Sequence, residues 1–347
     1  VVCDSRGIMP HRRLQRIGPL VGLPDIVRSH GVSMDAVVEG SGIEAEVFSN
    51  RDGVAPFVAI CQVMERAVKL TGRRHLGLDI GLAQDHRALG TVGQFVAHAP
   101  TLGEAIHDFV RNQHRNSRGA VTFLMPQGDG FHLGYGIYDR YETGADQLYD
   151  LAIAVGVNAV RSLAGTRAGP VEVLICHRGN ASRSHYEAAL GCPVRLNQPY
   201  AALTLSAEAM RLAIAGHDRA ERERLAALLD ATSAVGAPDF NARVRHLLKP
   251  AILMGDASAE TIAAQVGVHL RTLNRRLKDE GVTFRAIEQQ VRFSIACELL
   301  SLTDLDIADI SETLTYGTPS AFDRAFRRWT GVSPTRWRRD PAVVELD

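Results

Sequence analysis

The spacing of apolar positions changes along the chain, and each spacing predicts a different element. Helices with one buried face repeat their apolar residues every three to four positions. This period occurs over residues 24–39, 56–70, 102–115 and 147–164, and the last of these is apolar along almost its whole length. Alternating apolar and polar positions, rich in β-branched residues, predict short strands instead. The predicted strands cover residues 120–125, 130–138, 171–176, 193–196 and 201–205.

Turn residues organise these elements into a domain. Gly128, Asp129 and Gly130 lie between the first two strands and predict a hairpin. For residues 1–205 we therefore expect an α+β domain, in which helices cover one side of an antiparallel sheet.

Residues 206–239 are predicted to be a helical linker between two domains. Helical periods at 207–215 and 219–229 are followed by small residues and a proline at 233–238, a composition typical of a flexible joint. The apolar stripe of the second of these helices suits packing on either domain or on another subunit, and the sequence does not decide between them.

The last part, residues 240–347, is predicted to be all-α and repeats one two-helix pattern, near 259–280 and 307–329. In the first copy Gly267 supplies the tight turn, because glycine enters the left-handed conformation without steric cost. Each copy is therefore a helix-turn-helix unit, and a long helix over 284–300 separates the two. Pro250 is expected to kink or end the first helix of this domain, over 240–254.

A helix-turn-helix unit lays its second helix in the major groove of duplex DNA. The polar residues around the second helices are therefore predicted to contact DNA. They are His269, Arg271, Thr272, Asn274, Arg275 and Lys278 in the first unit and Thr318, Ser320, Ala321, Asp323, Arg324, Arg327 and Arg328 in the second. A rigid helix between the units suits successive major grooves, about 34 Å apart.

The run of residues 319–334, PSAFDRAFRRWTGVSP, with Val282, Thr283 and Phe284 before it, resembles the DNA-binding domain of AraC/XylS-type transcription regulators. The chain departs from the family pattern in three places: His269 stands where a small Ser or Thr is usual, Thr315 where Gly is usual, and Gly317 and Thr318 where an acidic or polar residue is usual. The resemblance implies which residues lie nearest the bases. They are Arg271, Asn274 and Arg275 in the first unit and Thr318, Ser320, Ala321 and Arg324 in the second.

Residues 76–82, 90–105 and 186–194 resemble the "arabinose-binding" type amino-terminal domain found in many of these regulators. The label names a sugar that individual members need not bind. The resemblance implies a homodimeric transcription regulator that binds duplex DNA, contacts RNA polymerase and senses a small-molecule effector, and the sequence does not decide between an activator and a repressor. The alternative is a regulator controlled by protein contact, with no small-molecule ligand.

Composition narrows the class of protein. Basic and acidic residues balance at 39 each, so attraction to phosphate depends on local patches, such as the six arginines and no acidic residue in 324–339. No apolar run approaches the roughly 20 residues of a membrane span. The five cysteines are scattered and lack CxxC spacing, which indicates reduced thiols and, with the missing span, a cytoplasmic protein.

Several patterns that resemble enzyme sites are interpreted otherwise. Residues 40–45 fit G-x-G-x-x-A but follow a helix-like run rather than a strand, which indicates a turn. His107 and His114 share a helix face without a third ligand at metal spacing. Cys176 and His177 are neighbours on a strand and point to opposite faces, with Cys176 in the core. We expect no enzyme activity, no cofactor and no metal.

Two groups of residues are candidates for an effector site. Arg111 and Arg115 lie four apart on a helix and suit a carboxylate or phosphate, the alternative being a solvated basic face. Phe131, Leu133 and Tyr135 share one strand face, where they either build the core or line a pocket between sheet and helices.

Overall fold

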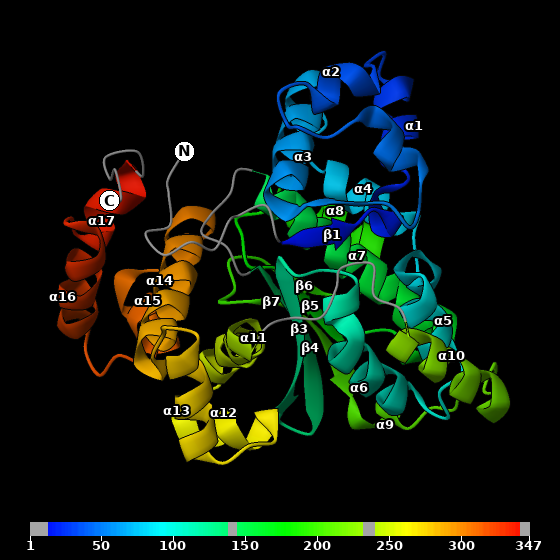
Figure 1. Cartoon of the computed structure of the whole chain (residues 1–347). Helices are drawn as coiled ribbons and strands as arrows, with labels where there is room; N and C mark the ends of the chain where they lie inside the picture. Colours follow the sequence, from blue (N-terminus) through cyan, green and yellow to red (C-terminus); the bar gives the residue numbers. More distant parts are fainter. Residues whose placement is uncertain (1–12, 138–143, 232–239, 341–347) are drawn as a thin grey trace.

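The computed structural model describes residues 13–137, 144–231 and 240–340. They form an N-terminal domain of helices around a sheet and, beside it, an all-helical C-terminal domain (Figure 1). This division confirms the predicted fold class. Within the described residues no helix is long and apolar enough to cross a membrane.

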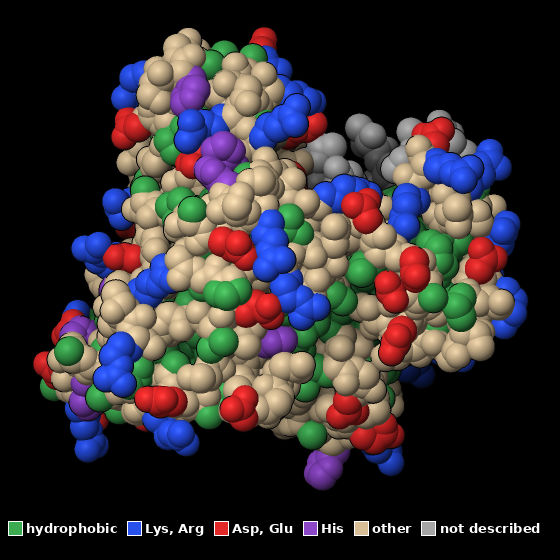
Figure 2. All heavy atoms as spheres, turned by 180° about the vertical axis from the view of Figure 1, so that it is seen from behind, with side chains coloured by type: hydrophobic (Ala, Val, Ile, Leu, Met, Phe, Trp, Pro, Cys, Tyr) green, Lys and Arg blue, Asp and Glu red, His purple; other side chains and the backbone are tan. Residues whose placement is uncertain are grey.

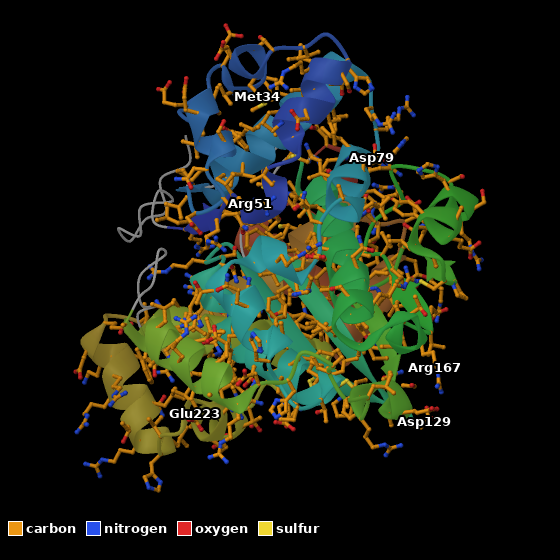
Figure 3. All side chains as sticks on the ribbon, turned by 90° about the vertical axis from the view of Figure 1, so that its right-hand side faces the viewer. Met34, Arg51, Asp79, Asp129, Arg167 and Glu223 are labelled. Atoms are coloured by element: carbon orange, nitrogen blue, oxygen red, sulfur yellow. The ribbon has the colours of Figure 1, made fainter. Side chains whose placement is uncertain are left out.

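The central sheet of the N-terminal domain has the strand order β3-β4-β7-β5-β6. Its strands are β3 Ala120–Gln127, β4 Gly130–Ile137, β5 Glu172–Leu174, β6 Val194–Arg195 and β7 Ala201–Ser206. β3 and β4 form the predicted hairpin, with Asp129 at its turn on the lower edge of the molecule (Figure 3). The prediction of an antiparallel sheet is wrong for β5 and β6, which pair in parallel. Helix α8, Arg183–Leu190, provides the crossover that a parallel pair requires.

The other helices of this domain pack on one face of the sheet and around its end (Figure 1). They are α1 Leu23–Ser29, α2 Met34–Val38, α3 Phe57–Thr71, α4 Leu76–Leu82, α5 Thr91–Ala97, α6 Leu102–Asn112, α7 Ala145–Ala164, α9 Ala207–Met210 and α10 Arg219–Ala231. Short 3-10 turns are η2 Gly18–Leu20, η3 Ala45–Ser49, η4 His86–Leu89, η5 Gln113–Arg115 and η6 Thr166–Ala168. A small antiparallel sheet of β1 Leu14–Arg16 and β2 Val54–Pro56 was not predicted.

The helix predicted over 24–39 is wrong in its length. Gly31 has a φ of 73° and follows the end of α1, so the segment divides into α1 and α2. A left-handed glycine ends a helix because its backbone turns away from the helical path.

Helix α7 is the buried helix that its apolar sequence predicts, and α4 packs closely against it. A Cβ atom at Gly77 would lie 1.9 Å from the Gln147 carbonyl oxygen, and one at Gly81 would lie 2.6 Å from that of Leu151. Both helices keep this separation because the two glycines carry no side chain.

The helices of the expected linker pack on the N-terminal domain. Leu225 and Leu229 of α10 are buried with Phe95 and Val96 of α5, so the apolar stripe covers this domain. Helix α9 ends at Met210, before the predicted end. The expected joint at residues 233–238 lies outside the described residues.

The C-terminal domain contains both predicted helix-turn-helix units. Its helices are α11 Phe240–Leu253, α12 Ala259–Val266, α13 Leu270–Asp279, α14 Phe284–Leu302, α15 Ile307–Thr313, α16 Pro319–Thr330 and α17 Pro334–Arg339. Helix α11 continues through Pro250, so the proline does not end the helix. Leu248 and Ile252, on either side of Pro250, are fully buried, and this packing compensates for the hydrogen bond that proline removes.

The two domains share the sheet. Val121, Phe123 and Met125 of β3 point to the face opposite α7, where Leu253 of α11 packs against them. The sheet therefore has helices of its own domain on one face and a helix of the C-terminal domain on the other.

The turn of the second helix-turn-helix unit holds a strained residue. Thr315 has a φ of 59°, which is unfavourable for a β-branched residue. We expect Thr315→Gly to raise the free energy of unfolding by about 1 kcal/mol, measured by urea denaturation. Thr313→Gly, in helix α15, is the control and should lower it, because glycine disfavours the helix. A decrease for Thr315→Gly would mean that the hydrogen bond from Arg292 to Thr315 Oγ1 outweighs the strain.

Candidate DNA-reading surface and inner cavity

The first recognition helix, α13, presents a polar face to solvent. Leu273 and Leu277 are buried, whereas Arg271, Asn274 and Arg275 are exposed. His269 and Lys278 are exposed as well, and Thr272 is half-buried. His269 is the N-cap residue and makes no side-chain cap hydrogen bond, so the usual cap is missing here.

The second recognition helix, α16, uses part of its predicted DNA face for its own structure. Thr318 Oγ1 caps the helix by accepting a hydrogen bond from Ala321 N at 3.2 Å. Asp323 forms a 2.7 Å salt bridge with Arg327. Ser320, Arg324 and Arg328 are exposed. The arginines at 324 and 328 form no hydrogen bond or salt bridge with other residues in the described part of the chain.

Packing holds the two recognition helices on one rigid frame. Phe293 of the spacer helix α14 contacts Phe326 and Trp329 of α16, with ring centroids 5.9 and 5.4 Å apart. The guanidinium of Arg276 lies 5.2 Å from the Phe240 ring centroid, which ties α13 to α11. Both recognition helices lie on the side of the C-terminal domain away from α5 and α10 (Figure 1).

Charges of both signs are mixed over most of the surface shown in Figure 2, and basic side chains gather only in places. From behind, basic and acidic side chains are interspersed over the N-terminal domain, and several Lys and Arg side chains lie along the outer edge of the C-terminal domain (Figure 2). This distribution agrees with a net charge of zero and with phosphate attraction limited to particular patches.

A buried ion pair joins the two domains. Lys249 of α11 and Glu298 of α14 are 4% and 6% exposed, and Lys249 Nζ lies 2.6 Å from Glu298 Oε2. Lys249 Nζ also donates to the Ile137 carbonyl oxygen at 2.5 Å. Tyr149 OH of α7 donates to Glu298 Oε1 and accepts a hydrogen bond from Ile137 N at 3.0 Å. The C-terminal pair is thus completed by atoms of the N-terminal domain.

A second contact between the two domains holds the C-terminal end of α14. It is made by Arg178, in the loop between β5 and α8 of the N-terminal domain. Arg178 donates to the carbonyl oxygens of Ser301 and Thr303 at 2.7 and 2.9 Å and pairs with Asp304 at 2.5 Å. These carbonyls are unpaired within the helix, so a cation from the other domain stabilises the helix end.

A buried hydrogen-bonded group around Asp150 supports the loop that carries Arg178. Asp150 accepts hydrogen bonds from Tyr186 OH at 2.7 Å and Asn180 Nδ2 at 2.9 Å, and it lies 3.1 Å from His177 Nε2. Gly179 N donates to His177 Nδ1, so the imidazole is occupied on both sides. The group holds the loop that carries Arg178. Cys176 is fully buried, as predicted.

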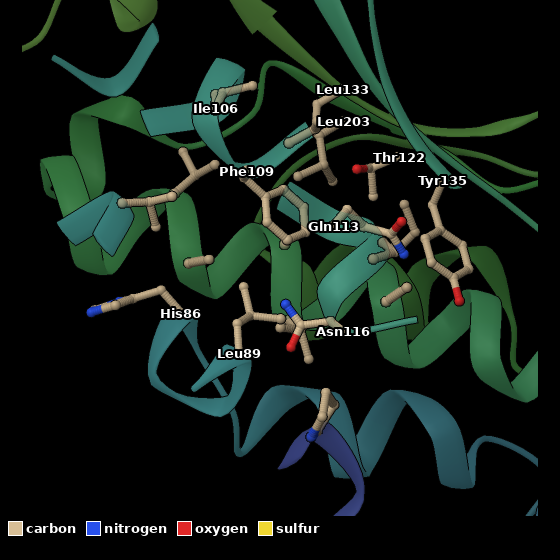
Figure 4. Close-up of a pocket in the computed structure, with 18 of the residues that line it drawn as sticks. His86, Leu89, Ile106, Phe109, Gln113, Asn116, Thr122, Leu133, Tyr135 and Leu203 are labelled. Atoms are coloured by element: carbon tan, nitrogen blue, oxygen red, sulfur yellow. The ribbon is translucent and has the colours of Figure 1, made fainter. Parts of the chain in front are cut away.

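A cavity of about 130 Å³ lies between the sheet and helices α6 and α7, and we name it the inner cavity. Apolar side chains make up most of its wall (Figure 4). They include Leu89, Val96, Leu102, Ile106, Phe109, Leu133, Leu151, Val155 and Leu203. Tyr135 completes the wall on the side of β4. An apolar pocket with a few polar groups is typical of small-molecule sites.

Three buried polar side chains reach this cavity with an atom that has no partner. They are Gln113, Asn116 and Thr122, which are 3%, 4% and 6% exposed. Gln113 Oε1, Asn116 Nδ2 and Thr122 Oγ1 make no hydrogen bond within the described structure. Figure 4 shows these groups among the rings of Phe109 and Tyr135. Buried polar atoms without partners are costly, so a cavity lined by three such side chains is suited to a ligand.

The predicted effector residues do not lie together. Leu133 and Tyr135 line the inner cavity, whereas Phe131 packs in the core of the N-terminal domain. Arg115 donates to the Leu229 carbonyl oxygen and lies 3.5 Å from Asp230, so it caps α10 and does not form a clamp with Arg111.

Arg111 lines a separate hollow of about 560 Å³ between α6 and α11, which we name the basic hollow. Its described lining includes Arg118, Arg243 and Arg245 but no Asp or Glu. Burial, and then the charge of Arg115, lowers the pKa of His114. Burial also lowers the pKa of His246 to about 4. Both imidazoles are therefore neutral at pH 7.

The amides of the inner cavity were missed in the sequence, although one signal was present. Ile106, Phe109 and Gln113 are spaced three and four apart, which places the amide of Gln113 on the apolar face of its helix. Asn116 follows the helix end, and Thr122 pairs across the sheet with Tyr135. Only the packing of sheet on helix brings these side chains to one place.

Comparison with known proteins identifies the family to which the two domains belong. The family model "Arabinose-binding domain of AraC transcription regulator, N-term" matches residues 31–214, and a helix-turn-helix domain model matches residues 262–340. The chain belongs to the AraC-type transcription regulators. This membership confirms the resemblance seen in the sequence and the expectation of a DNA-binding regulator rather than an enzyme.

Two relatives of this regulator match along nearly its whole length. The ornithine utilization regulator of Pseudomonas aeruginosa is 27% identical over 92% of this chain and 94% of that protein. The regulator VirS of Mycobacterium tuberculosis is 26% identical over 94% of this chain and 96% of that protein. The solved structure of CdpR from Pseudomonas aeruginosa covers 77% of this chain and 87% of that chain, at 24% identity and a TM-score of 0.41.

The buried pair between Lys249 and Glu298 generates a stability prediction. We expect Lys249→Met to lower the free energy of unfolding by about 3–5 kcal/mol, because Glu298 loses its counter-ion inside the protein. The double variant with Glu298→Met should recover at least half of this loss in urea denaturation. Arg219→Ala, which breaks an exposed salt bridge to Glu223, is the control and should leave the midpoint unchanged. If the double variant is no more stable than Lys249→Met, the loss of stability does not come from the unpaired charge of Glu298.

Proposed function

We propose that a small molecule bound in the inner cavity controls how the two helix-turn-helix units of this AraC-type regulator sit on DNA. The observation that carries the proposal is the group of three unpartnered polar atoms, Gln113 Oε1, Asn116 Nδ2 and Thr122 Oγ1, in an apolar cavity. A pocket that leaves such atoms unsatisfied loses stability when empty and regains it when a ligand pairs with them.

We assign the predicted DNA-contacting residues three roles: contact with base edges, contact with phosphate, and support of the recognition helix. Arg271, Asn274 and Arg275 read base edges in one major groove, since they project from the exposed face of α13. Arg324 and Ser320 act in the same way on α16, whereas Arg328 contacts phosphate. Thr318 and Asp323 contribute through the cap and the salt bridge that shape the helix. RNA polymerase and a second copy of the chain are the further partners proposed, in the cytoplasm.

A chain of contacts supports a route from the cavity to the DNA-binding domain. Tyr135 lines the cavity, and its ring meets the Tyr149 ring edge-on, with centroids 5.6 Å apart. Tyr149 donates to Glu298, which lies on the spacer helix between the two units. A ligand that moves Tyr135 thereby changes the free energy of the domain contact. This differential binding to two arrangements is what allosteric control requires.

Selection against random duplex DNA at near-physiological salt tests the DNA-reading role. We expect an asymmetric site with two conserved blocks about ten base pairs apart. Arg275→Ala should weaken operator binding by about 1–3 kcal/mol and relax the preference at one base pair. Arg328→Ala is the matched comparison and should weaken all sequences alike, with the salt slope reduced by about one. An unchanged base preference for Arg275→Ala rejects its reading role.

Tyr149→Phe tests the route between cavity and DNA. Removing the hydroxyl deletes the hydrogen bond to Glu298, so we expect operator affinity to change about tenfold, as for the loss of one hydrogen bond to a charged group. Thr71→Val, which deletes a hydrogen bond to the Ala67 carbonyl oxygen inside α3, away from the cavity lining and the domain contact, is the control and should leave operator affinity unchanged. Equal operator affinities for both variants and the parent protein, measured by fluorescence anisotropy, would show that the contact does not control DNA binding.

A further inference from the structure

The inner cavity limits the size of its ligand. Its volume of about 130 Å³ is close to the 150 Å³ or so of an engineered protein cavity that accepts benzene. A single ring with one small substituent therefore fills it. Phe109, Leu133 and Leu203 surround this space from α6, β4 and β7 and provide apolar contact for such a ring (Figure 4).

The wall of the cavity also limits the charge of the ligand. Its described lining includes no Asp, Glu, Lys or Arg. His86 is the imidazole of the lining, and burial lowers its pKa, so it is neutral at pH 7. Figure 4 shows this imidazole directed away from the other labelled side chains. A charged ligand would be buried without a counter-ion, which costs more than the apolar contacts return.

The three unpartnered polar atoms specify the polar group of the ligand. Arg16 Nη1 donates to Asn116 Oδ1 at 3.0 Å, which orients that amide and leaves its Nδ2 as a donor. Gln113 Oε1 is an acceptor. A hydroxyl group both donates and accepts, so it can pair with either amide, and Thr122 Oγ1 can serve either role. A sugar, with a hydroxyl on almost every carbon, would leave several unpaired in the apolar wall.

We propose that the inner cavity binds a neutral ring of about benzene size that carries one hydroxyl group, as phenol does. This inference rests on the proposed control by a small molecule and names the chemical class of that molecule. It differs from the sugar in the family's name and from any charged amino acid.

Isothermal titration of the full chain with phenol tests the class. For a ligand of this size we expect a Kd on the order of 0.1–1 mM. Benzene lacks the hydroxyl and should bind about tenfold more weakly. Benzoate, which matches the ring but carries a charge, and L-arabinose should not bind measurably. Tighter binding of benzoate or arabinose than of phenol overturns the class, and so does the absence of phenol binding up to its solubility limit.

Variants locate the binding. Gln113→Met and Thr122→Val should each weaken phenol binding about tenfold, since each removes one hydrogen-bonding atom. Without phenol, Thr122→Val should raise the melting temperature, because an unpaired buried hydroxyl is gone. Thr204→Val is the matched control: Thr204 Oγ1 is also buried and unpartnered but lies outside the cavity lining. Equal loss of phenol affinity in Thr204→Val and Thr122→Val rejects the assigned site.

Operator binding separates the ligand class from the proposed function. Phenol that binds the cavity and changes operator affinity supports both. Phenol that binds with the expected variant effects but leaves operator affinity unchanged supports the ligand class and overturns control through this cavity. Another outcome is that benzoate or arabinose binds instead, binds Gln113→Met more weakly and changes operator affinity. This result overturns the ligand class, whereas regulation through the inner cavity stands.

Discussion

The buried pair between Lys249 and Glu298 is the interaction on which the arrangement of the two domains depends. Two charges in a protein interior are stable only when every remaining donor and acceptor is paired. Here Ile137 and Tyr149 of the other domain complete the set. Gly136 makes room, since a Cβ atom there would lie 2.8 Å from Lys249 Cε. Separating the domains would therefore break the hydrogen bonds from Lys249 to Ile137 and from Tyr149 to Glu298.

The domain contact and the inner cavity meet at one tyrosine pair. Tyr135 belongs to the cavity wall and Tyr149 to the ion-pair network, and the two rings touch. Arg178 holds the far end of α14. The spacer helix between the two helix-turn-helix units is thus bound to the N-terminal domain at Glu298 and at its C-terminal end. Under the proposed control, a change in the sheet around the cavity would act on this spacer helix, which packs against α16.

The elements predicted most accurately depend on local interactions. Gly267 ends α12 in the left-handed conformation, and Leu273 and Leu277 orient α13, so a few neighbouring residues define the first unit. Features that depend on distant partners were missed. The parallel pairing of β5 with β6 follows from their place in the whole sheet, and α11 continues through Pro250 because its flanks are buried by other helices.

The sequence by itself determined that this protein is a DNA-binding regulator, with an α+β domain before two helix-turn-helix units. Its periodicity, turn residues and polar helix faces are local patterns, which short stretches of the chain contain in full. The tertiary structure alone decided the inner cavity and the domain contact. Gln113, Asn116 and Thr122 come from separate elements, and Lys249 and Glu298 lie 49 residues apart. The roles of such residues follow from packing in three dimensions, which no short stretch of sequence encodes.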